Sequence, residues 1–120
     1  YHMMKRHNSF LLGSFQDMEI VGFKSLFGHT YPDEELTDAL FRVERGVGRH
    51  PGTYAEGFRR GGLMATYLIG PLLPLNPPFT RYLLEQMGAR DVHLAFEDTA
   101  MKAYRARVEE FRDEKRGYQY

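Results

Sequence analysis

Apolar residues recur through the N-terminal part of the chain at intervals that are mostly three or four. Between Ser9 and Phe27 they are Phe10, Leu11, Phe15, Met18, Ile20, Val21, Phe23, Leu26 and Phe27. This spacing places side chains on one face of a helix, although Gly13 and Gly22 weaken helix formation. We therefore expect a helix. The alternative is a short strand from Met18 to Phe23, because β-branched and aromatic residues suit a sheet.

A second helix, of about fifteen residues, is expected to begin near Pro32. Proline fits the first helical position, and the acidic residues 33–35 complement the positive end of the helix dipole. The apolar residues that follow at helical spacing are Leu36, Leu40, Val43 and Val47. Gly46 or Gly48 would end this helix. The acids are explained by the helix start, so we interpret them as structural rather than catalytic.

The third predicted helix begins with a capping box, the sequence Thr-Tyr-Ala-Glu at 53–56. It would carry Gly57, Gly61 and Ala65 at intervals of four. Such a row of minimal side chains lets another backbone approach closely. We therefore predict that these three residues contact a partner.

Residues 63–75 form the most apolar stretch, but Gly70, Pro71 and Pro74 interrupt it. A membrane span requires about twenty apolar residues. A buried helix that leads into a proline-rich connector is therefore favoured over a transmembrane helix. The prolines at 77 and 78 then favour the start of a short helix over about 78–87, with Gly88 as its end.

The C-terminal part predicts a long amphipathic helix from about Asp98 to Arg116. Its apolar positions, separated alternately by three and four residues, are Met101, Tyr104, Val108 and Phe111. Four positions are too few to predict a free-standing coiled coil. We expect this stripe to pack on the protein's own core first and to serve as a partner-binding surface second.

These elements predict an all-α fold, a compact bundle of about four to five helices with a proline-rich connector and a long C-terminal helix. The chain has 120 residues, which suits one domain. We expect that domain to span 9–120, after a disordered or tag-derived segment at 1–8. No long apolar run follows Lys5 and Arg6, so we expect no secretion and an intracellular location, cytoplasmic or organellar.

Composition narrows the candidate chemistry. Sixteen basic and sixteen acidic residues cancel, so no global field attracts nucleic acid or an anionic membrane. The absence of cysteine excludes disulfides, thiolate nucleophiles and cysteine-ligated zinc. No nucleophile-elbow or nucleotide-binding fingerprint occurs. His93 and Glu97 are four residues apart, but ordinary helix pairs share that spacing. We therefore predict no catalytic residues, no metal and no cofactor.

One cluster of cations stands out between the second and third predicted helices. It consists of Arg42, Arg45, Arg49, Arg59 and Arg60. Guanidinium groups bind phosphate and carboxylate with two hydrogen bonds at once. The cluster is explained either by dipole compensation and salt bridges or by an anion-binding patch.

Three functions follow. We favour a non-catalytic helical interaction or structural subunit that acts through protein contacts, with another protein or another copy, within a larger assembly. Association with a membrane complex is compatible with this hypothesis. The first alternative is a module that binds nucleic acid or anionic lipid through the arginine cluster. The second is a small enzyme that uses His29, His50 or His93 as an acid–base group. An enzyme is the less favoured class.

Overall fold

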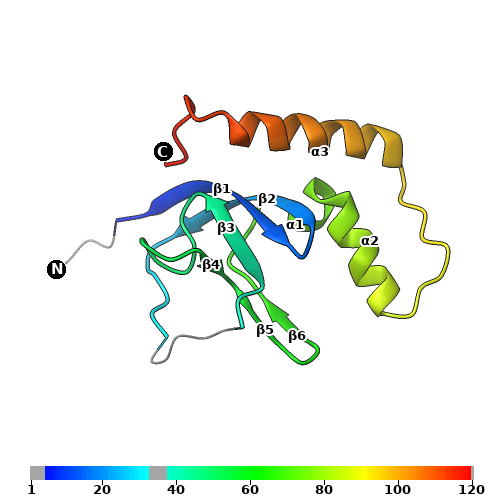
Figure 1. Ribbon diagram of the computed structural model, residues 1–120, viewed down its shortest axis with the longest axis horizontal. Coiled ribbons are helices and arrows are strands. Elements are labelled where there is room, and N and C mark those ends of the chain that lie inside the picture. Colours follow the sequence, from blue (N-terminus) through cyan, green and yellow to red (C-terminus); the bar gives the residue numbers. More distant parts are fainter. Residues whose placement is uncertain (1–4, 33–37, 120) are drawn as a thin grey trace.

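The computed structural model describes residues 5–32 and 38–119, which form a mixed fold rather than an all-α bundle (Figure 1). The strands are β1 (His7–Phe15), β2 (Met18–Leu26), β3 (Phe41–Arg45), β4 (Ala55–Glu56), β5 (Phe58–Arg60) and β6 (Leu63–Ala65). The helices are α1 (Leu72–Leu75), α2 (Pro77–Gln86) and α3 (Glu97–Arg112). The predicted helical bundle is therefore wrong. The predicted boundary after residue 8 falls inside β1.

The first two strands form an antiparallel hairpin where one helix was predicted. Their register pairs Phe15 with Met18 and His7 with Leu26. Leu11 and Leu12 are both buried, because successive side chains of a strand point to opposite faces and both faces of this sheet are covered. A strand buried on both faces has an almost continuous apolar sequence, which also matches helical spacing. The alternative of a short strand from Met18 to Phe23 is the correct one, and β2 continues to Leu26.

The second predicted helix is also replaced by a strand. In β3, Phe41 and Val43 are buried while Arg42 and Glu44 are exposed, which is the two-residue period of a half-buried strand. The larger sheet has the strand order β2-β1-β3-β4, and its neighbouring strands pair in antiparallel orientation. The acids at 33–35, which prompted the helix prediction, lie outside the described residues.

The third predicted helix is absent as well, because residues 55–65 form β4 and the β5-β6 hairpin. Gly57 and Gly61 have φ angles of +66° and +57°, which side-chain-bearing residues rarely adopt. A Cβ at Gly57 would lie 2.4 Å from the carbonyl oxygen of Ala65. Gly57 thus permits a close backbone approach between the end of β4 and β6, whereas a Cβ at Gly61 would meet nothing within 4 Å.

The two C-terminal helix predictions are confirmed. Helix α2 begins at Pro77, and α3 covers most of the predicted 98–116. The predicted buried helix within 63–75 is wrong, because this segment contains β6, an isolated bridge at Ile69 and the four-residue α1. Within the described ranges, no helix combines the length and the apolar character needed to cross a membrane.

Two apolar clusters lie on opposite faces of the larger sheet, and Figure 1 shows α3 lying along one side of the β1-β2 hairpin. On the α3 side, the buried residues are Phe10, Leu12, Val21, Tyr104, Val108 and Phe111. On the other side they are Leu11, Phe15, Ile20, Leu40, Phe41, Val43, Leu68 and Phe79. Packing of the terminal helix on the protein's own core is therefore confirmed for three of its four stripe residues, and Met101 packs at the margin.

The outer edge of β2 is covered by groups from three later segments. The side-chain amide of the buried Asn76 accepts a bond from the Val21 amide (2.8 Å) and donates to its carbonyl (2.7 Å). Ile69 exchanges two backbone bonds with Phe23. The Tyr104 hydroxyl donates to the carbonyl of Glu19 (2.8 Å), and burial raises the pKa of that hydroxyl. An uncovered edge strand would otherwise invite pairing with another chain.

Candidate functional site

A buried ion pair joins the two strands that are furthest apart in the larger sheet. Lys24 of β2 and Glu56 of β4 are 4% and 0% exposed, and their Nζ and Oε2 atoms are 2.5 Å apart. Lys24 also donates to the carbonyl of Gly48 (2.6 Å). The other oxygen of Glu56 accepts bonds from the Thr66 hydroxyl (2.9 Å) and the Tyr67 amide (3.0 Å). These bonds offset part of the cost of removing both charges from water.

Arg49, one of the predicted anion-binding residues, is buried next to this pair. Its Nε and Nη2 atoms donate to the carbonyl of Gly57 at 2.9 and 2.6 Å, and its guanidinium carbon lies 4.1 Å from the centre of the Phe58 ring. Burial lowers the pKa of Arg49, while Glu56 and Asp38 act in the opposite direction. The guanidinium therefore holds the turn between β4 and β5.

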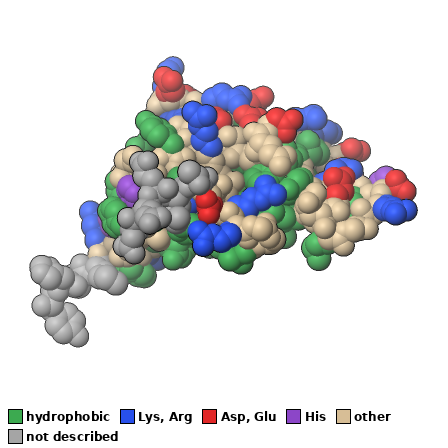
Figure 2. Space-filling model, turned by 60° about the horizontal axis from the view of Figure 1, so that its bottom comes forward, with side chains coloured by type: hydrophobic (Ala, Val, Ile, Leu, Met, Phe, Trp, Pro, Cys, Tyr) green, Lys and Arg blue, Asp and Glu red, His purple; other side chains and the backbone are tan. Residues whose placement is uncertain are grey.

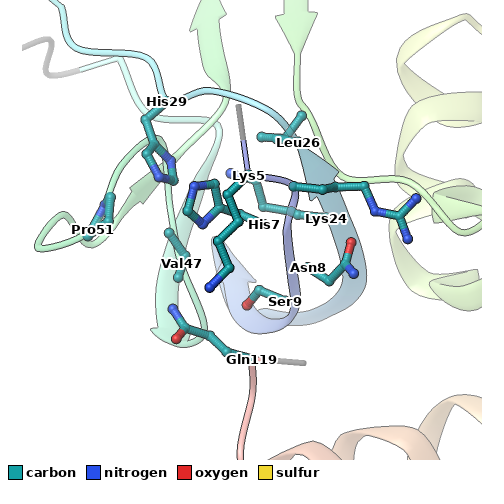
Figure 3. Close-up of a pocket in the computed structure, with 11 residues that line it drawn as sticks. Lys5, His7, Asn8, Ser9, Lys24, Leu26, His29, Val47, Pro51 and Gln119 are labelled. Carbon is teal, nitrogen blue, oxygen red and sulfur yellow. The ribbon is translucent and has the colours of Figure 1, made fainter. Parts of the chain in front are cut away.

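A cavity of about 320 Å³ opens beside the Lys24 ammonium, at the end of the β1-β2 hairpin (Figure 3). Its lining residues are Lys5, Arg6, His7, Asn8, Ser9, Lys24, Leu26, His29, Val47, Pro51 and Gln119. Figure 3 shows the rings of His7 and His29 facing one another, and their centroids are 4.8 Å apart. We name this cavity the Lys24 pocket.

His29 and His50, two of the three histidines considered for acid–base chemistry, both contact the ring of Tyr31 near the Lys24 pocket. The ring of Tyr31 stacks on His50 at 4.5 Å and meets His29 edge-on at 6.4 Å. The Nδ1 atom of His29 is buried without a hydrogen-bond partner in the described part of the chain. Burial lowers the pKa of His29, and the positive charges of His7, Lys24 and His50 lower it further. The neutral imidazole is thus favoured at pH 7.

The other predicted arginines have separate partners. Arg45 donates to three carbonyl oxygens in and after the last turn of α3, those of Phe111, Asp113 (2.7 Å) and Arg116 (2.6 Å). Carbonyls at a helix C-terminus lack partners within the helix, so a cation there satisfies them. Arg45 therefore fastens the end of α3 to β3.

Arg59 donates to the Tyr82 hydroxyl of α2 (3.1 Å), whereas Arg60 contacts the carboxylate of Asp38 (3.3 Å). Arg42 is exposed on β3. The five guanidiniums consequently point to different parts of the molecule rather than to one patch. Anion binding by this cluster stays a prediction.

The structure gives His93 and Glu97 different surroundings. Glu97 makes an ion pair with Arg81 of α2, and His93 precedes α3 in an exposed position. In residues 5–32 and 38–119, no group of three or more histidines and acids is arranged to hold a metal ion.

Sequence reasoning missed Lys24, Glu56 and Asn76 as organising residues. Lys24 interrupts an apolar run that otherwise predicts burial, which is the signal of a buried cation with an unknown partner. Glu56 was interpreted as part of a capping box, and Asn76 was given no separate role. Their partners lie 32 and 55 residues away in the chain, beyond the reach of local patterns.

Comparison with known proteins gives one partial similarity. No protein-family model matches the chain. Over 71 residues the chain is 42% identical to the lipid II isoglutaminyl synthase (glutamine-hydrolyzing) subunit GatD of Staphylococcus aureus strain N315. The match covers 59% of this chain and 28% of GatD. This chain is therefore similar to a part of GatD, little more than a quarter of that protein's length.

Proposed function

We propose that this chain is a non-catalytic structural or interaction component of a larger intracellular assembly, related to a glutamine-hydrolysing synthase. The observation that carries the proposal is the 42% identity over 71 residues to a protein named as a synthase subunit. A subunit acts together with other chains. Similarity at this level over 71 residues supports a shared fold in that stretch and, with it, a shared role in assembly.

The positions of the polar side chains support a structural role. Covalent catalysis requires a nucleophile within hydrogen-bond reach of a base. Instead, the Ser9 hydroxyl donates to the carbonyl of Phe10 (2.6 Å), and the Ser25 hydroxyl donates to the side-chain oxygen of Asn8 (2.9 Å). The buried charges of Lys24 and Glu56 neutralise one another. These groups hold segments together.

Exposed apolar side chains offer surface for protein contacts. A groove of about 280 Å³ is lined by Leu73, Pro74, Pro77, Thr80, Leu94, Ala95 and Ala100. Phe96, the next residue after Ala95, is 87% exposed and has a φ angle of +54°. On the face seen in Figure 2, hydrophobic side chains reach the surface between charged ones. Grouped exposed apolar residues are typical of interaction sites.

A chimera tests the assembly role. The matching stretch of S. aureus GatD is replaced by that of this chain, and the chimera is produced together with the rest of the synthase. We expect the chimera to co-purify with its partner subunit in a yield close to that of unmodified GatD. GatD without this stretch is the negative control. A folded chimera that stays alone on light scattering would contradict the proposal.

An assay of the isolated chain tests the non-catalytic part. We expect no release of ammonia from glutamine above a protein-free blank. Hydrolysis that disappears when His29, His50 and His93 are all changed to Gln would instead establish the histidine-dependent enzyme. The triple variant is purified in the same way as the wild type, so it also serves as the control for contaminating activity.

A further inference from the structure

The charges around the Lys24 pocket are of one sign. Its lining includes Lys5, Arg6 and Lys24 as cations, with His7 and His29 beside them, and none of the eleven described lining residues is acidic. Glu56 neutralises the charge of Lys24 from behind the pocket, so the positive charge of the lining comes from Lys5 and Arg6. Among the residues that the structure describes, the lining therefore carries a net positive charge, which favours an anion.

Lys24 has donor capacity left for such an anion. An ammonium group has three N–H donors, and two of them bond to Gly48 and Glu56. The third has no partner within residues 5–32 and 38–119. Because Lys24 is 4% exposed, its position is fixed by the sheet rather than by solvent. A fixed, partly desolvated donor binds an anion more strongly than a mobile surface lysine.

The rest of the lining suits an organic group. Leu26, Val47 and Pro51 supply an apolar wall, and Asn8 and Gln119 supply amide groups. Figure 3 shows Lys5 extending across the pocket toward Gln119. The volume of about 320 Å³ falls at the lower end of the range for small-molecule sites.

We propose that the Lys24 pocket binds a small organic phosphate, with the phosphate group between Lys5, Lys24 and the two histidines and the organic group against Leu26, Val47 and Pro51. A phosphate monoester carries close to two negative charges at neutral pH and accepts several hydrogen bonds. A carboxylate would neutralise only one of the pocket's cations. This site is separate from the arginine cluster and from the surfaces proposed for assembly.

The unpartnered His29 nitrogen supports this assignment. A buried polar atom without a partner in a native fold calls for a physical explanation, and a missing ion is one of the recognised ones. The cations that face His29 from β1, β2 and the loop before β4 are His7, Lys24 and His50. A bound dianion would reverse their effect and raise the pKa of His29.

Calorimetric titration of the full chain with phenyl phosphate tests the proposal. We expect saturable binding that weakens at least tenfold in the Lys5→Ala/His29→Gln variant. The matched control is Lys102→Ala/His93→Gln, which removes the same groups from exposed positions of the C-terminal part. Circular dichroism confirms the fold of each variant. Absence of saturable binding, or equal weakening in both double variants, would overturn the proposal.

Three further ligands separate the parts of the site. Inorganic phosphate should bind more weakly than phenyl phosphate, because it leaves the apolar wall empty, and phenol should not bind measurably. Equal affinities for the two phosphates would remove the organic subsite from the proposal. Sulfate stays dianionic over the pH range in which a histidine titrates. It should therefore raise the pKa of His29 in an NMR titration. An unchanged His29 titration under saturating sulfate would contradict the placement of the anion.

Discussion

The two faces of the larger sheet are closed by different kinds of interaction. On one face, α3 covers β1 and β2 with aromatic contacts, such as the stacked rings of Phe10 and Phe111 at 4.1 Å. The opposite face is covered by short segments from β5-β6, α2 and the connectors. There, Lys24 follows Ile20 on the same side of β2, and its charge is buried with that of Glu56.

The two faces differ because α3 is one continuous helix, whereas the segments that cover the opposite face are short. A continuous amphipathic helix satisfies its own backbone groups except at its ends, so apolar packing attaches its length to the sheet and Arg45 attaches its C-terminal end. Short irregular segments leave backbone carbonyls and amides that need partners. The bonds of Glu56 to Tyr67, of Lys24 to Gly48 and of Arg49 to Gly57 supply them. Buried charge is therefore expected where the covering backbone is irregular.

The largest expected loss of stability follows from changes on the face of the sheet that α3 covers. Tyr104→Ala/Phe111→Ala removes two buried aromatic side chains, each worth about 3–5 kcal/mol of unfolding free energy. We expect the double variant to be unfolded or nearly so in chemical denaturation. Arg105→Ala, at an exposed position of the same helix, should change stability by less than about 0.5 kcal/mol. Full stability together with lost self-association would show that the stripe binds a partner instead.

An intermediate loss of stability is expected when Arg45, which fastens the end of α3 to β3, is removed. Arg45→Ala removes three bonds to carbonyl oxygens, and bonds made by a charged group contribute about 1.5–3 kcal/mol in mutational series. Arg42→Ala, on the same strand but exposed, should have almost no effect. The difference between the two unfolding free energies measures the attachment. Equal values would mean that Arg45 does not hold α3.

The smallest expected effect is on the pH dependence of the free energy of unfolding. The pKa of His29 is lowered in the folded state, so the unfolded state binds more protons below the usual histidine pKa of about 6.5. The contribution of His29 is therefore fully present above that pH and is lost as pH falls through the folded pKa. Denaturation at pH 7.5 and pH 5 should show a smaller loss of stability for His29→Gln than for wild type. His93→Gln should keep the wild-type pH dependence.

Local patterns were sufficient for the helices that cover the sheet. Pro77 marks the start of α2, and the spacing of Tyr104, Val108 and Phe111 indicates both α3 and its buried side. These signals operate within one or two turns of chain. The C-terminal third was therefore predictable from its own residues.

The strands were not predictable in this way, because their burial depends on distant segments. Leu11 and Leu12 are both buried only because α3 covers one face and residues from α2 and Leu68 cover the other. The same limit applies to the candidate site. Lys24 meets Glu56 through the strand order of the sheet, which places β1 and β3 between them.

A double-mutant cycle at Lys24 and Glu56 tests most directly whether buried charge closes the irregular face. Lys24→Met and Glu56→Leu each leave one charge buried without its partner, so each should cost about 3–5 kcal/mol of unfolding free energy. The double variant removes both charges, and we expect it to cost clearly less than the sum of the single variants. Additive costs would contradict the account, because they would show that the two groups act independently.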